Sequence, residues 1–137
     1  MTDSVRERLL TAILTATGGQ YGLPAPEDAR DLPVTIVQDG DDAATASYDA
    51  TECAMPLSIG RAEAAASTNR DALRMQAHAA LAAILTAMHA DETFGGLAAR
   101  VDYNGGGIQT EAGRLVFAEA SFTVTYRHAR GQPAVLA

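Results

Sequence analysis

The sequence predicts an α+β fold in which two helices pack on one face of a mixed, mostly antiparallel sheet of four to five strands. Residues 4–16 and 69–90 repeat apolar side chains every three or four positions, which is typical of amphipathic helices. Within the predicted long strand 114–128, residues 122–127 alternate aromatic and β-branched side chains with polar ones, which is typical of a strand. A chain of 137 residues is the size of one domain, so we expect a single domain over residues 1–137.

Charge and cysteine content argue against several kinds of site. The formal net charge is −7, whereas a nucleic-acid-binding face needs a basic surface, so we expect no specific binding of DNA. Cys53 is the only cysteine, which excludes an internal disulfide and a cysteine-based metal site. The charged start and the lack of an apolar run of about 20 residues predict a soluble protein on the cytoplasmic side of a cell.

The first helix is predicted over residues 4–16. Ser4 can cap its first turn, and Glu7 three residues later completes a capping box. Gly18 ends the helix, and the proline-containing segment 18–33 is predicted to be irregular. The expected apolar face is Val5, Leu9, Ala12, Ile13 and Ala16, and the expected solvent-facing residues are Arg6, Glu7 and Arg8.

Three short strands are expected before the second helix, at residues 34–37, 44–48 and 53–59. In the third, apolar residues alternate with smaller ones on either side of Pro56. Proline has no N–H to donate to a neighbouring strand, so residues 53–59 are predicted to form an edge strand or a bulged one. An acidic turn with Asp39, Asp41 and Asp42 lies between the first two strands.

The second helix, residues 69–90, is predicted to cross the sheet, because 22 residues span about 33 Å. Thr68 or Asn69 can cap it. One stripe is expected to pack on the strand face of Phe122, Val124 and Tyr126; it consists of Leu73, Ala77, Ala80, Leu81, Ile84, Leu85 and Met88. A second face of small residues would allow close approach of a helix or a neighbouring subunit; it consists of Ala72, Ala79, Ala82 and Ala83.

The C-terminal part is predicted to form the spine of the sheet. The expected elements are a strand at 97–103, a glycine-rich hairpin tip at 104–107, a short pairing segment at 108–110 and the long strand at 114–128. Leu115 and Phe117 have the opposite parity to Phe122, so either both faces of this strand are covered or a bulge near residues 118–121 exchanges them. Glycine and proline within residues 130–133 end the strand.

The sequence contains no arrangement of residues that predicts catalysis, and we expect a protein that is not an enzyme. His78, His89 and His128 are too widely separated to form a metal-binding motif. Residues 104–107 lack the lysine and hydroxyl residue of a phosphate-binding loop, and the acidic turn lacks the twelfth-position glutamate of an EF-hand. We therefore expect no catalytic residue, no metal and no cofactor.

Three segments, in order, carry a resemblance to a known family. An amphipathic helix, SVRERLLTAIL, leads through a proline-containing loop into a short strand, LPVTIVQ. The long helix ends in a glycine pair that runs straight into a strand, LTAMHADETFGGLAARV. The chain closes on a tyrosine-containing strand, a basic residue and a Gly-x-Pro turn, FTVTYRHARGQP. Over nearly the whole chain, this order resembles the tail-terminator (tail-completion) proteins of long-tailed bacteriophages.

The resemblance implies a structural protein of the virion. Such proteins form a homomeric, typically hexameric, ring on top of the tail tube and stop its polymerisation. The implied partners are further copies of this chain, the major tail-tube protein and a head-completion or neck protein, with DNA passing through the lumen unbound and no membrane involved. The implied location is the neck end of the virion tail, after assembly in the host bacterial cytoplasm. The free chain could be a monomer until the finished tube templates the ring.

Two sets of residues are candidate contacts of such a ring. Acidic side chains on an inner wall would repel phosphate, so the first lumen candidates are Asp39, Asp41 and Asp42, although an outward solvated turn fits equally well. Segments that could expose backbone donors or adaptable turns are the candidate subunit or tube contacts, with residues Cys53, Met55, Leu57, Asn104, Gly105, Gly106, Gly107, Arg127 and Arg130. The alternatives are another neck or minor tail protein of the virion, or a small ligand-binding or enzymatic α+β domain, which needs a convergent pocket.

Overall fold

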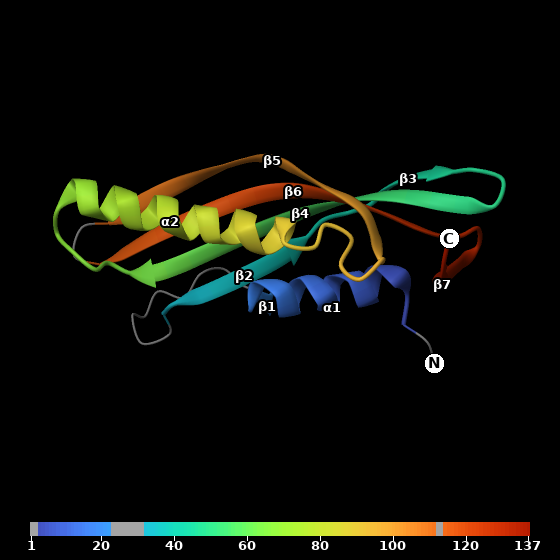
Figure 1. The fold of residues 1–137 in the computed structure, drawn as a ribbon, viewed down its shortest axis with the longest axis horizontal. Coiled ribbons are helices and arrows are strands. Elements are labelled where there is room, and N and C mark those ends of the chain that lie inside the picture. The colour runs from blue at the N-terminus through green and yellow to red at the C-terminus, as the bar shows by residue number, and fades with distance from the viewer. Residues whose placement is uncertain (1–2, 23–31, 112–113) are drawn as a thin grey trace.

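The computed structural model describes residues 3–22, 32–111 and 114–137, and Figure 1 shows both helices on the same face of the sheet. The described elements are α1 (Val5–Thr17), β1 (Gln20–Tyr21), β2 (Val34–Asp39), β3 (Ala43–Ala46), β4 (Ala50–Ala64), α2 (Arg70–His89), β5 (Ala98–Glu111), β6 (Leu115–Ala129) and β7 (Gln132–Leu136). The predicted α+β class is confirmed. Among the described residues, the sheet has seven strands, which is more than the four to five expected.

The two longest strands form the centre of the sheet. β4 and β6 have 15 residues each and pair antiparallel over their whole length without a register shift. The strand order is β1-β2-β4-β6-β5, with β3 also beside β4 and β7 beside β6. β1 pairs in parallel with β2, and the other described pairs are antiparallel, so the mixed, mostly antiparallel sheet is confirmed. The long C-terminal strand is its spine, as predicted.

β1 and β7 are the strands that the sequence does not predict. β1 has two residues and lies in the segment that glycine and proline mark as irregular. β7 has five residues, includes Pro133 and follows the turn at Gly131. Both are short and lie at the edge of the sheet, where strands need little β propensity and tolerate proline.

Both helices begin at capping residues that the sequence predicts. Ser4 Oγ accepts a hydrogen bond from the backbone N–H three residues later, at 3.0 Å, and Gly18 ends α1 in the left-handed conformation with φ 67°. Asn69 Oδ1 accepts hydrogen bonds from the N–H groups of Asp71, at 2.9 Å, and Ala72, at 3.1 Å. These bonds satisfy donors that the first helical turn would otherwise leave unpaired.

The core lies between the two helices and one face of the sheet. That face consists of odd-numbered residues of β4 and even-numbered residues of β6, including Phe122 at 1% exposure. The predicted stripe of α2 is confirmed for its buried members, Leu73, Ala77, Ala80, Ile84 and Met88. Leu81 and Leu85 are only half-buried. Leu81 lies over Gly106 of β5, at the edge of the sheet, which explains why the buried stripe is narrower than predicted.

Pro56 lies in the central strand β4, so the prediction of an edge or bulged strand is wrong. β2 pairs with β4 as far as Leu57, and β3 pairs with it as far as Ala54. Pro56 therefore faces the break between these two strands, where its carbonyl accepts the N–H of Gly40 at 2.9 Å. In an antiparallel strand the N–H and C=O of one residue point to the same side. A backbone N–H at position 56 would therefore point at the turn between β2 and β3 and not at a paired strand, so its absence in proline removes no bond between strands.

Residues 104–107 lie inside β5, so the prediction of a hairpin tip is wrong. β5 continues past them to Glu111, with register shifts after Ala98 and after Tyr103. A Cβ on Gly106 would lie 2.5 Å from the Glu119 carbonyl oxygen, so only glycine allows the two backbones to approach this closely. The glycine run marks a bulged edge strand.

β6 keeps one face toward the core along its whole length. Its even-numbered residues from Val116 to Tyr126 are buried, and its register with β4 is unbroken, so no bulge exchanges the faces. Phe117 is half-buried on the opposite face, where its ring lies over Gly60. Of the two alternatives given for Leu115 and Phe117, the structure supports the first, in which both faces of β6 are covered in this region.

Candidate association surface

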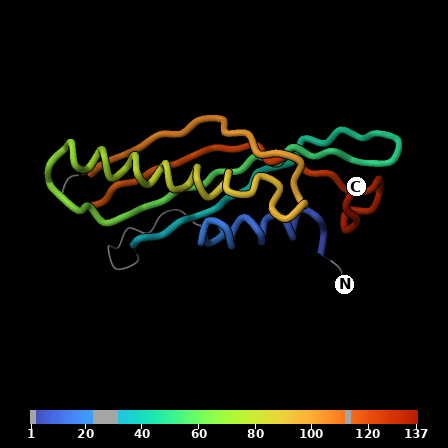
Figure 2. Tube along the Cα trace, in the orientation of Figure 1, coloured from blue at the N-terminus to red at the C-terminus, as the bar shows by residue number. Residues whose placement is uncertain are grey.

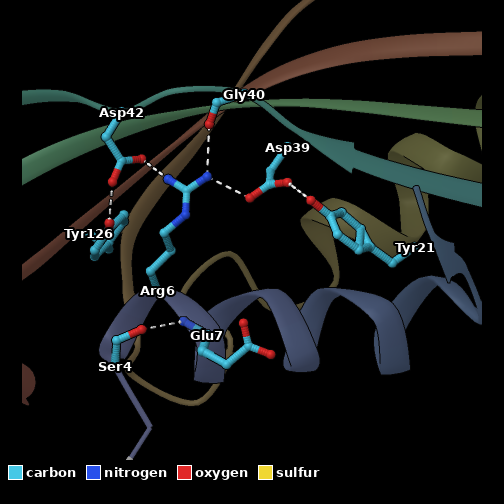
Figure 3. Close-up of polar contacts among 8 residues, drawn as sticks. All are labelled: Ser4, Arg6, Glu7, Tyr21, Asp39, Gly40, Asp42 and Tyr126. Carbon is cyan, nitrogen blue, oxygen red and sulfur yellow. Dashed lines mark hydrogen bonds and ion pairs between the residues drawn. The ribbon is translucent and has the colours of Figure 1, made fainter.

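Arg6 of α1 binds the acidic turn between β2 and β3 (Figure 3). Its Nη2 donates to Asp39 Oδ2 at 2.5 Å and to the Gly40 carbonyl at 2.7 Å, and its Nη1 donates to Asp42 Oδ1. The guanidinium thus joins the first helix to the point where the sheet passes from β2 to β3. The prediction that Arg6 faces solvent is wrong, because its side chain is 28% exposed and binds two carboxylates.

The position of Arg6 follows from Leu10, which the predicted apolar face omits. At about 100° per residue, Arg6 falls between Val5 and Leu10 on the helix surface, within the buried arc that also holds Leu9 and Ile13. An arginine in this position keeps its charge paired only by extending past the apolar layer to an acidic partner. The position of Arg6 between the apolar residues Val5 and Leu10 on the helix surface is the sequence signal that predicts a paired, partly buried arginine.

Two tyrosines complete the Arg6 cluster, which we define as Arg6, Tyr21, Asp39, Asp42 and Tyr126. Tyr126 donates to Asp42 Oδ2 at 2.5 Å, and Tyr21 donates to Asp39 Oδ1. Burial and the hydrogen bond to Asp42 raise the pKa of Tyr126 above its ordinary value. Burial opposes the ionisation of Asp39, but hydrogen bonds from Tyr21 and Arg6 outweigh it and lower its pKa. At neutral pH, Tyr126 therefore stays a donor and Asp39 stays charged.

The three carboxylates of the acidic turn differ in their exposure to solvent. The side chains of Asp39 and Asp42 are 11% and 23% exposed and point to Arg6, whereas Asp41 is exposed. The charge of Arg6 offsets part of the negative charge that the turn was expected to present. Whether these residues line a lumen depends on a ring, so that assignment stays a prediction.

Arg8 holds the C-terminal strand against α1. Its Nη2 donates to the Ala134 carbonyl of β7 at 2.7 Å, and the residue is half-buried. The prediction that Arg8 lies in solvent is therefore wrong, because β7 covers it. Glu7, the third residue of this expected face, is exposed as predicted.

A hairpin projects beyond both helices, as Figures 1 and 2 show. We call it the arm and define it as β3, the turn at residues 47–49, and residues 50–54 of β4. All four residues of β3 are exposed, and Tyr48 in the turn is 93% exposed. The backbone N–H of Ser47 donates to the Ala50 carbonyl at 2.8 Å and closes the turn. The Arg6 cluster lies at the base of the arm.

The sheet face that is buried in the body becomes exposed in the arm. Cys53 and Tyr126 pair across β4 and β6, and each is 3% exposed. The next row on the same face crosses four strands and forms what we call the arm platform: Ala46, Thr51, His128 and Leu136. Ala46 is exposed and Leu136 is 46% exposed, and β3 projects past both helices (Figure 1). The sheet face thus continues from the buried core to a row in which Ala46 and Leu136 are exposed and the polar residues Thr51 and His128 are half-buried.

The contact residues predicted in β4 lie in the core. Cys53, Met55 and Leu57 are 3%, 0% and 3% exposed. β4 has strands on both sides, so its backbone groups are paired within the sheet. The expectation that this strand exposes backbone donors is wrong, because β2, β3 and β6 flank it.

The other predicted contact residues lie at the surface. Asn104, Gly105, Gly106 and Gly107 belong to β5, whose outer edge pairs with no described strand. Arg127 is exposed on the arm-side end of β6 and pairs with Glu52 at 2.8 Å. Arg130 is exposed in the turn before β7, and its N–H donates to the Asp49 carbonyl at 3.0 Å. Their role as contacts stays a prediction.

The sheet face opposite the helices carries a shallow groove of about 450 Å³ between β5 and β6, with both polar and apolar residues in its lining. Glu119 is the titratable residue in its described lining, and it accepts a hydrogen bond from Ser58 Oγ at 2.9 Å. Across residues 3–22, 32–111 and 114–137, no three His, Cys, Asp or Glu side chains gather as metal ligands. Neither described helix has the length and hydropathy needed to cross a bilayer.

Sequence comparison finds no matching family model and no matching curated protein. Among solved structures, the fold resembles a chain of one titled "Virion of native gene transfer agent (GTA) particle", with a TM-score of 0.40 and 13% sequence identity. The match covers 89% of this chain and 90% of that chain. A likeness of this size carries no inference about function, so the role of this protein is argued from its own residues.

Proposed function

We propose that this protein is a structural tail terminator that caps the tail tube of a long-tailed phage as a closed ring of identical subunits, six being the expected number. The ring stops tube polymerisation and offers a surface to head-completion or neck proteins, with DNA passing through its lumen. In this role the protein is not an enzyme and uses no cofactor. The sequence resemblance, which covers nearly the whole chain, motivates the choice of family.

The arm is the observation that carries the proposal. It projects past both helices, with Tyr48 exposed at its tip and the arm platform partly exposed. Exposed apolar surface and an open strand edge mark a contact with another chain, and tyrosine is a common anchor of such contacts. A subunit that completes its core through a neighbour suits a ring.

The asymmetry of the chain also suits a ring. The arm projects at one end of the long axis, and the first turn of α2 lies at the other (Figure 1). A contact between two different surfaces repeats from copy to copy and closes when the rotation between copies divides a full turn. The two ends of such a ring differ, so one can match the tube while the other receives the head-side protein.

The charge of the protein suits a lumen through which DNA slides. The net charge is −7, and acidic walls repel phosphate. On the sheet face away from the helices, Arg127 pairs with Glu52 at 2.8 Å and Arg100 pairs with Asp102 at 2.9 Å. These pairs leave that face without a surplus of positive charge that would hold DNA.

Deletion of the gene from the parent particle tests the proposal. We expect over-long or ragged tails that fail to join filled heads, measured as a tail-length distribution by electron microscopy. A wild-type copy supplied in trans should restore the length. Tails of normal length that fail to join heads would indicate another neck or minor tail protein. Normal tails joined to heads would contradict both roles and favour a ligand-binding or enzymatic domain.

A further inference from the structure

The arm carries exposed negative charge next to an aromatic side chain. Residues 40–60 contain no lysine or arginine, and their acidic residues are Asp41, Asp42, Asp49 and Glu52. Asp42 and Glu52 already pair with arginines of the same chain. Asp49 is exposed beside Tyr48, which is 93% exposed. The tip of the arm is therefore both apolar and acidic.

Two arginines give the exposed side of α2 the opposite charge near its first turns. Arg70, Arg74 and His78 follow at intervals of four residues, so they form one stripe, and all three are exposed. Asp71 lies 3.6 Å from Arg74, but both side chains are more than half exposed, at 81% and 56%. Such a pair contributes little and leaves the arginine available. Met75, beside the stripe, is 64% exposed and adds an apolar contact.

These two surfaces cannot meet within one chain. Figure 1 shows the arm projecting past both helices at one end of the sheet and the first turns of α2 at the other end. The pairing along the whole of β4 and β6 holds the base of the arm to the body. A contact between the arm and this side of α2 therefore joins two copies. Because this contact joins two different surfaces, each copy can use its arm on one neighbour and its α2 on another, so the contact repeats from copy to copy.

We propose that the arm of one copy docks on the exposed side of α2, along Arg70, Arg74 and His78, in a second copy of this chain. Tyr48 packs against Met75, and Asp49 faces Arg74. The contact rests on the proposed function, because it specifies how one subunit binds the next in the ring.

Each part of the contact has a distinct physical role. Tyr48 and Met75 lose water together, and apolar burial of this kind supplies affinity. The opposite charges steer the two copies and fix the register of the arm on the helix. The arm platform continues the sheet face that packs on helices inside the chain, so it is suited to receive a helix surface from a neighbour.

Disulfide trapping tests the contact. The native Cys53 does not interfere, because it is 3% exposed and will not react at the surface. One full-length variant carries Ser47→Cys on the arm, and the other carries Ala79→Cys, one helical turn after Met75. We expect a covalent dimer when the two variants are mixed and oxidised, and several-fold less when either is oxidised alone. The control Thr11→Cys, on the exposed side of α1, should not react with Ser47→Cys.

Two outcomes of the trapping experiment would overturn the contact. Efficient dimerisation of Ser47→Cys with itself would indicate pairing between two arms. Failure of the mixed pair to react at high protein concentration would show that the arm and α2 do not meet. Trapping captures brief encounters, so it works even where the free protein is mainly monomeric.

Charge exchange tests the register. Adding Asp49→Arg to the arm variant, or Arg74→Asp to the helix variant, should lower the dimer yield about twofold to fivefold, the size expected for an exposed ion pair. Mixing the two doubly substituted variants should restore the yield. Absence of restoration would overturn the pairing of Asp49 with Arg74.

The deletion experiment separates this contact from the proposed function. Over-long tails without a mixed dimer would overturn the contact and leave the terminator role standing. A mixed dimer, together with normal tails joined to heads, would keep the contact and overturn the role.

Discussion

At the residue scale, Arg6 joins α1 to the sheet. Arg6→Ala would leave Asp39 and Asp42 close together without their cation, and we expect the free energy of unfolding to fall by about 1.5–3 kcal/mol. The matched control is Arg74→Ala, because the Arg74 side chain is 56% exposed and its loss should change this free energy by less than about 0.5 kcal/mol. Urea unfolding measures both variants. Equal stabilities would contradict a stabilising role for the Arg6 cluster.

Asp39 makes part of that stability depend on pH. Its pKa is lowered in the folded protein, so its contribution is fully present above the unfolded value, about 4, and is lost as the pH falls through the folded value. We expect Asp39→Asn to be less stable than wild type at neutral pH, with a difference that shrinks on acidification below about pH 4. Urea unfolding over a pH series measures the difference. A gap that stays constant, or widens in acid, would show that the carboxylate is not stabilised by folding.

At the element scale, the packing of α2 is tested by the same substitution at two sites. Leu73 is 1% exposed and packs with Ala77 and Val116, whereas Leu81 is half-buried over β5. Leu73→Ala should cost about 2–5 kcal/mol in unfolding free energy, and Leu81→Ala should cost less than half as much. Denaturant unfolding of the two variants gives the ratio. A larger loss at Leu81 would reverse the orientation of the helix described above.

The glycine run of β5 gives a second matched pair. A Cβ on Gly106 would lie 2.5 Å from the Glu119 carbonyl oxygen, whereas a Cβ on Gly107 would meet nothing within 4 Å. Gly106→Ala should lower the unfolding free energy by about 1–3 kcal/mol. Gly107→Ala should leave it within about 0.5 kcal/mol or raise it slightly. Thermal and urea unfolding measure both, and equal effects would count against close approach of β5 to β6.

The elements that the sequence predicts well are those with a local signal. Each helix has a periodic apolar face and a capping residue, and β6 has an alternating pattern, so their positions follow from neighbouring residues alone. The place of Pro56 depends on the break between β2 and β3, which its own neighbours in the sequence do not reveal. The glycines at 105–107 look like a turn locally, and only the backbone of β6 explains them.

The candidate surface is harder to predict than the fold. Alternation shows which residues share a face of the sheet, but it does not show where the covering helices end. Cys53 and Thr51 share a face in β4, yet one is buried in the core and the other belongs to the arm platform. For this reason the sequence alone does not show that Cys53, Met55 and Leu57 are buried in the core. Tyr48 lies in a short turn with no distinctive local pattern.

At the scale of the whole molecule, the arm gives the chain two unlike ends. One end offers Tyr48 and the arm platform, and the other offers the basic stripe of α2. Surfaces of this kind on identical copies build a ring when the geometry closes and a filament when it does not. In the proposed ring, the finished tube supplies a template that favours closure.

The central claim is that copies of this protein form a single ring at the end of the tail tube that faces the head. Electron microscopic reconstruction of the head–tail junction in intact particles tests it most directly. We expect one ring of this chain, with six copies, between the last tube ring and the neck proteins. Copies spread along the tube, located at the far end of the tail, or bound to the head without touching the tube would contradict the claim.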